Sequence, residues 1–164
     1  MKRIFSFLVI ALAILSCSDE NPGSTSRAFY KNSQLTLSDN PGVYLDWTEG
    51  DKTVFRFGLT HPDDKNISDD ELTEYFWIEV PSNISAFEIE NFEPSENSKN
   101  IYYTRNCFCF IPEAFQFEKA QVTGTKISAN RWRISFDIVA VGEDNTYVLK
   151  DSGEYGLGSI DFTP

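Results

Sequence analysis

Apolar and polar residues alternate along most of the chain after residue 27, and turn-forming residues separate the alternating runs. In residues 53–59, Phe55, Phe57 and Leu59 fall on one face of an extended chain. The same period of two recurs in residues 43–47, 75–80 and 132–138. A period of two with many β-branched and aromatic residues is typical of half-buried β-strands. No long segment keeps a helical period.

Turn chemistry divides these runs into short strands. Residues 38–42, 128–131, 142–145 and 151–153 are rich in Ser, Asp, Asn and Gly, which favour turns. They predict hairpins that pair residues 120–128 with 131–141, and residues 145–150 with 154–162. Strands and turns without helices indicate an all-β fold, either an antiparallel β-sandwich or a lipocalin-like barrel. We expect a single domain over residues 28–164.

The segment 101–111 differs because it is apolar on both faces after Arg105. A half-solvated strand would not carry aromatic residues opposite Cys107 and Cys109. We therefore expect a second sheet on one side and a loop, a short helix or a partner on the other. Both cysteines are expected to be buried thiols, because one His and no second Cys pair cannot complete a metal site.

Residues 75–80 offer the best candidate for ligand binding. With Phe76, Ile78 and Val80 toward the core, the opposite face carries Tyr75, Trp77 and Glu79. Exposed aromatic rings beside a carboxylate suit a sugar, whose apolar faces stack on rings and whose hydroxyls form hydrogen bonds. The alternative is that these side chains pack under a loop or line a barrel interior.

Residues for catalysis are scarce, so we expect no enzyme, no catalytic residue, no metal and no cofactor. His61 is the only His, and we expect it to be an ordinary solvated loop side chain. Glu88 and Glu90 could imitate a glycosidase pair, but they fit the wet face of a strand better. The acidic loop 61–71 lacks the residue order of known Ca²⁺ loops.

The N-terminus has the form of a secretory signal. Met1-Lys2-Arg3 precedes an apolar stretch over residues 4–15, which is shorter than the roughly 20 residues that cross a bilayer. A positive end, a short apolar middle and a small residue at the break are typical of signal peptides. We assign residues 1–16 to a signal peptide.

The break at Ile14-Leu15-Ser16-Cys17 resembles the lipobox of bacterial lipoproteins. The resemblance implies that signal peptidase II cleaves before Cys17 and that this residue carries the lipid. Ser18, Asp19 and Glu20 are similar to the acidic export tag of surface lipoproteins in the Bacteroidota. The strand-rich remainder is similar in style to small Bacteroidota lipoproteins with sandwich or lipocalin-like folds. Residues 17–27 are then a lipidated flexible tether, and the location implied is the outer membrane, at the cell surface.

Charge excludes one class of partner. The formal charge is −11 for the whole chain and −13 once Lys2 and Arg3 leave with the signal peptide. Such a surface repels nucleic acid. The sequence therefore predicts a membrane-anchored, non-catalytic lipoprotein that binds a glycan or another small ligand. The alternative is a structural subunit that docks on a membrane or surface protein partner, with the strand near 106–111 in the contact.

Overall fold

The computed structural model of the chain describes residues 23–37, 45–62, 72–91, 100–106, 116–142 and 146–159. The predicted signal segment, Cys17 and the predicted acidic tag lie outside these residues, as do residues 107–115 and the acidic residues 63–71. The described residues form the strands β1 (Ser24–Leu37), β2 (Leu45–Thr60), β3 (Thr73–Pro81), β4 (Ala86–Asn91), β5 (Ile101–Asn106), β6 (Gln116–Ser128), β7 (Arg131–Val141) and β8 (Thr146–Leu157).

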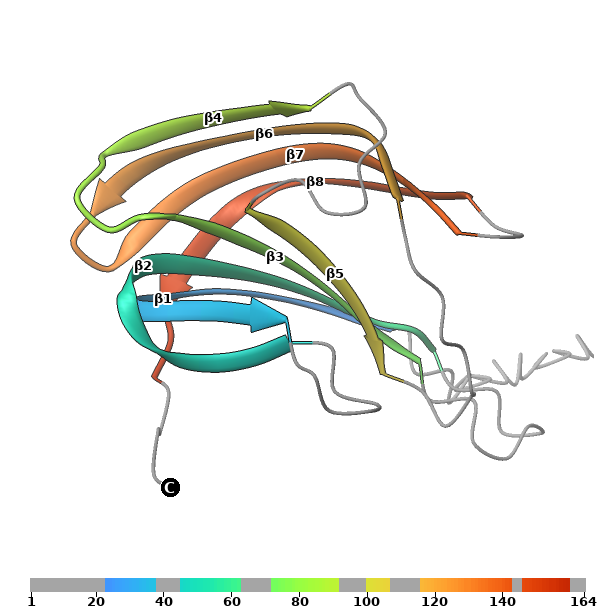
Figure 1. The fold of residues 1–164 in the computed structure, drawn as a ribbon, viewed down its shortest axis with the longest axis horizontal. Helices are drawn as coiled ribbons and strands as arrows, with labels where there is room; N and C mark the ends of the chain where they lie inside the picture. The colour runs from blue at the N-terminus through green and yellow to red at the C-terminus, as the bar shows by residue number, and fades with distance from the viewer. Residues whose placement is uncertain are drawn as a thin grey trace, which may run out of the picture.

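All eight strands belong to one sheet in the order β4-β6-β7-β8-β1-β2-β3-β5. The sheet folds over on itself, so that β4, β6, β7 and β8 form an upper layer above β1, β2, β3 and β5 (Figure 1). The layers join where β1 and β8 run parallel, through two paired positions only. The predicted all-β, single-domain fold is confirmed. The sheet is not closed into a barrel, and its two layers resemble a sandwich.

Aromatic side chains fill the space between the layers. The Phe55 ring, fully buried on β2, lies 5.2 Å from the Trp132 ring of β7. The Phe136 ring, also on β7, lies 5.2 Å from Phe57 and 4.9 Å from Phe76. These contacts join residues that alternation placed on inward faces. Because β1 and β8 pair at only two positions, apolar packing between the two layers contributes much of the free energy that holds the layers together.

The β1–β2 hairpin bends back below the lower layer (Figure 1). Asn32 has a φ of 53°, and the register shifts there, so that Ser33 is paired with both Glu49 and Lys52. A β-bulge of this kind increases the twist and bends the strands, and Asn tolerates the left-handed conformation better than most residues. We call residues 33–37 and 45–49 the folded hairpin.

Two sequence-based boundaries were wrong. The sheet begins at Ser24 rather than after residue 27, because residues 24–27 pair with the last residues of β2. Arg27 also donates to both carboxylate oxygens of Asp151 on β8, at 2.7 and 2.6 Å. The predicted hairpin at 151–153 does not exist, since β8 continues from Thr146 to Leu157 along β7. Gly153 instead leaves room for the Arg27 side chain, since an added Cβ would lie 2.7 Å from Nε of Arg27. The hairpin of β6 and β7 is confirmed.

Candidate functional site

Two of the three predicted ligand-binding residues lie together on the outer face of the lower layer. Trp77 and Tyr75 are both partly buried on β3, with ring centroids 5.8 Å apart. The indole N–H of Trp77 donates to Oγ1 of Thr104 on β5, at 3.1 Å. The Tyr75 ring crosses over Gly58, where an added Cβ would come within 3.1 Å of it. These contacts fix both rings against the sheet.

Glu79, the third predicted residue, does not face solvent as expected. Its side chain is buried, and its carboxylate accepts a hydrogen bond from the backbone N–H of Leu35, at 2.8 Å. Leu35 belongs to the folded hairpin, which covers this end of β3. The packing alternative therefore applies to Glu79, because its carboxylate is needed to bind the hairpin backbone.

The folded hairpin also supplies an aromatic wall. The Trp47 ring meets the Trp77 ring edge-on at 5.2 Å and the Tyr30 ring edge-on at 4.4 Å. Tyr30 is buried, while Trp47 stays partly exposed like Trp77 and Tyr75. Burial raises the pKa of Tyr30, and the nearby Arg56 guanidinium opposes that rise. The folded hairpin thus covers one side of the outer face, while Trp47, Tyr75 and Trp77 stay partly exposed.

Arg56 stands among these rings and was not predicted as a site residue. It pairs with Trp77 across the β2–β3 ladder. Its guanidinium carbon lies 5.6 Å from the Tyr30 ring centroid, 5.5 Å from that of Tyr75 and 5.9 Å from that of Trp77. A cation over several rings is attracted by their negative faces. We call Tyr30, Trp47, Arg56, Tyr75 and Trp77 the aromatic–arginine cluster.

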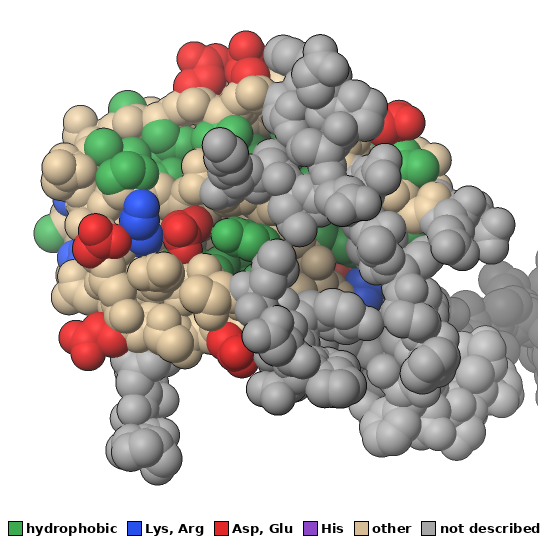
Figure 2. All heavy atoms as spheres, viewed as in Figure 1, with side chains coloured by type: hydrophobic (Ala, Val, Ile, Leu, Met, Phe, Trp, Pro, Cys, Tyr) green, Lys and Arg blue, Asp and Glu red, His purple; other side chains and the backbone are tan. Residues whose placement is uncertain are grey.

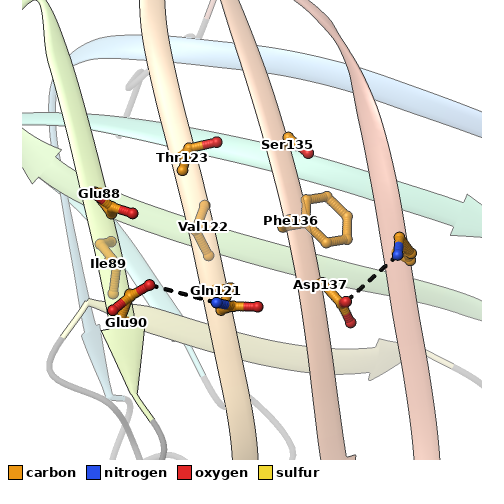
Figure 3. A pocket seen from close by; sticks show the side chains of 10 residues that line it. Glu88, Ile89, Glu90, Gln121, Val122, Thr123, Ser135, Phe136 and Asp137 are labelled. Carbon is orange, nitrogen blue, oxygen red and sulfur yellow. Dashed lines mark hydrogen bonds and ion pairs between the residues drawn. The ribbon is translucent and has the colours of Figure 1, made fainter.

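A second feature is a polar trough on the outer face of the upper layer (Figure 3). It is an open hollow of about 290 Å³. Four strands line it with carboxylates, hydroxyls, an amide and an amine, and it contains no exposed ring. The polar side chains are those of Glu88, Glu90, Gln121, Thr123, Ser135, Asp137 and Lys150.

One carboxylate of the polar trough, that of Asp137, has two lysine partners. Asp137 accepts a hydrogen bond from Lys119 at 2.8 Å, and the Lys150 amine lies 3.5 Å away. The hydrogen bond from Lys119 is the main reason that the pKa of Asp137 is lowered. In the part of the face that Figure 2 shows in colour, acidic side chains are scattered rather than gathered into one patch. The trough offers hydrogen bonds to a ligand but no stacking platform.

The third feature is a hydrogen-bonded network where β3 and β5 approach β8. The imidazole Nε2 of His61 lies 2.7 Å from Oε2 of the buried Glu74, so His61 is not the ordinary solvated side chain that the sequence suggested. The Tyr103 hydroxyl donates to the other oxygen of Glu74. Burial, followed by this hydrogen bond, raises the pKa of Tyr103. Arg105 donates to the hydroxyl of Tyr147 at 2.9 Å, which joins the two layers.

The carboxylate of Glu74 is fully engaged within this network, which fits a structural role. The two oxygens of Glu74 are taken by His61 and Tyr103, with Nε of Arg105 at 3.7 Å. Within the ranges that the structure describes, no cluster of three or more His, Cys, Asp or Glu could hold a metal ion. Glu88 and Glu90 are exposed on β4, as the wet-face interpretation expected.

Comparison of the chain with protein-family models, with curated proteins and with solved structures finds no match. Among the described residues, no helix is long and apolar enough to cross a membrane. A functional assignment therefore depends on the residues themselves.

Proposed function

We propose that this chain is an outer-membrane lipoprotein, held by a lipid on Cys17 and displayed at the cell surface, whose β-domain binds a glycan. The aromatic–arginine cluster is the proposed binding site. We further propose that the protein is not an enzyme and binds without a cofactor. The observation that carries the proposal is the partly exposed group of rings at Tyr75, Trp77 and Trp47. Two of these rings, Tyr75 and Trp77, lie beside the guanidinium of Arg56.

Rings in this arrangement have the chemistry that a sugar needs. A sugar ring has one face of C–H groups, which packs against an aromatic face, and hydroxyls that require donors and acceptors around it. Tyr75 and Trp77 are fixed by Gly58, Thr104 and their neighbours, so little conformational entropy is lost when a ligand orders them. The polar trough lacks such rings and ranks second as a glycan site.

Support for the anchor comes from the sequence. The lipobox-like Ser16-Cys17 follows a short apolar segment, and the acidic Asp19 and Glu20 come next. Two or more acyl chains give stable anchoring, since each buried methylene contributes about 0.8 kcal/mol. The structured sheet begins at Ser24, so only a short tether separates Cys17 from the domain. The alternative docking role depended on residues 106–111, of which 107–111 lie outside the described part of the chain.

Replacing Trp77 by Phe tests the binding site. We expect glycan binding to weaken by about tenfold, because a large stacking surface is lost from the site. The melting temperature should fall by only about 4 °C, since Phe retains most of the packing against Trp47 and Arg56. Alanine is less informative here, because the edge-on contact with Trp47 would also disappear. The measurements are a glycan array and a thermal melt of the unlipidated mature chain.

Trp132→Phe is the matched control. Trp132 is buried between the layers, 5.2 Å from Phe55, so its substitution should lower the melting temperature and leave the array signal unchanged. A wild-type chain that binds no glycan on the array would refute the proposed function. Equal binding by wild type and Trp77→Phe would move the site away from the aromatic–arginine cluster.

A further inference from the structure

The aromatic–arginine cluster contains hydrogen-bond donors that lack acceptors. Nε of Arg56 and Nε1 of Trp47 are both buried, and neither has a hydrogen-bond partner among the described residues. Buried polar groups are nearly always paired in folded proteins, so two orphans in one cluster require an explanation. Both orphans are donors. The cluster therefore has hydrogen-bond donor capacity that the described residues leave unused.

Arg56 also lacks a counter-charge. Within the described part of the chain its guanidinium forms no ion pair, and it lies over the three rings of Tyr30, Tyr75 and Trp77. The other buried or half-buried arginines differ, because Arg27 binds Asp151 and Arg105 lies 3.7 Å from Glu74. Glu79, the carboxylate of this face, is buried beneath the folded hairpin and bonded to Leu35. Among the described residues the positive charge of Arg56 thus has no ion-pair partner, in a chain whose net charge is −11.

The surroundings of Arg56 strengthen the interaction that its guanidinium would form with an anion. The rings of Tyr75 and Trp77 lie 5.5 and 5.9 Å from the guanidinium carbon. A charge-assisted hydrogen bond is stronger beside such apolar surfaces, where the local dielectric constant is low. Arg56 itself remains partly exposed, so a ligand can reach it from the side that the folded hairpin leaves uncovered. The planar guanidinium fork matches a carboxylate through two parallel hydrogen bonds.

We infer that the ligand of this cluster is an acidic sugar, whose carboxylate binds Arg56 while its ring stacks on Tyr75 and Trp77. This inference rests on the proposed glycan-binding function and specifies its substrate class. A neutral sugar would leave the charge of Arg56 without a partner.

The test compares tetragalacturonic acid with its methyl ester, which keeps the sugar rings and removes the charges. Both are titrated calorimetrically into the unlipidated mature chain at low salt. We expect the acid to bind at least about tenfold more tightly than the ester, and 1 M NaCl to remove most of the difference. Arg56→Gln should abolish the preference, and Arg56→Lys should retain part of it, because an ammonium keeps the charge but not the fork.

The outcomes separate this inference from the function on which it rests. Equal affinity for the acid and the ester, or a preference that survives Arg56→Gln, overturns the role of Arg56 and leaves glycan binding intact. Array binding confined to neutral sugars overturns it as well. Failure to bind any glycan overturns both proposals. Because the comparison of acid and ester uses the wild-type chain, it gives a result even if the Arg56 variants fold poorly.

Discussion

Replacing Cys17 by Ala should release the protein completely from the membrane fraction and abolish acyl labelling. The thiol is the group that accepts the diacylglycerol in the lipobox reaction, and no other side chain can form that thioether. Loss of two or more acyl chains removes many buried methylenes at about 0.8 kcal/mol each, which is the whole anchoring free energy. Metabolic labelling with a clickable fatty acid, followed by fractionation, measures both effects.

Ser18→Ala is the matched control, because it changes the neighbouring residue and keeps the thiol. It should remain labelled and membrane-bound. Unchanged labelling of Cys17→Ala would refute the anchor. Protease added to intact cells then reports display: the wild-type domain should be cut, and cutting should decrease when Asp19 and Glu20 are both changed to Ala. A wild-type domain that resists the protease on intact cells but not on lysed cells would contradict surface display.

Replacing Phe55 by Ala should cost about 3–5 kcal/mol of unfolding free energy. The side chain is fully buried, and its ring contacts Phe29 in its own layer at 5.9 Å. It also contacts rings of the upper layer, Phe87 at 5.5 Å and Trp132 at 5.2 Å. Since β1 and β8 pair at only two positions, a cavity at Phe55 weakens the main connection between the layers.

Urea denaturation followed by circular dichroism measures this loss. Val148→Ala is the control, because Val148 is 69% exposed on β8 and its truncation should change stability by less than about 0.5 kcal/mol. Similar losses for Phe55→Ala and Val148→Ala would contradict the description of a core shared by the two layers.

Alternation along the chain was enough to predict the strands and much of the core. In β7, Trp132, Ile134 and Phe136 alternate with polar residues, and all three are buried. A period of two determines which side chains share a face, whatever the strand pairs with. The all-β fold and the β6–β7 hairpin follow from such local signals and from turn residues.

Features that depend on long-range contacts were missed. The folded hairpin needs a bulge at Asn32 together with the hydrogen bond between Leu35 and Glu79, 44 residues apart. Gly153 was interpreted as a turn residue. The structure gives another reason for a glycine at this position, the close approach of the Arg27 side chain, which comes from the other end of the chain. The partners in both contacts are distant in the sequence, so local composition could not predict them.

The candidate site was predicted only in part, because alternation along a strand was visible in the sequence and the pairing between strands was not. Tyr75 and Trp77 were found because they alternate with Phe76 and Ile78 on one strand. Arg56 carries an equivalent signal, since it stands between the inward-facing Phe55 and Phe57 and must point outward. Its place beside Trp77 became known only from the β2–β3 register. Only the strand register shows that Arg56 lies among the rings of the aromatic–arginine cluster.

The most direct test of glycan binding at the aromatic–arginine cluster is an NMR titration that follows the three indole N–H signals. The titrant is the glycan with the strongest array signal. Trp47 and Trp77 lie in the cluster, whereas Trp132 is buried between the layers. We predict saturable shifts of the Trp77 and Trp47 signals and of the Arg56 Nε–H signal, with Trp132 unmoved. Shifts confined to the polar trough, at Gln121 and Thr123, would contradict the proposed site, and a spectrum that does not change would contradict glycan binding itself.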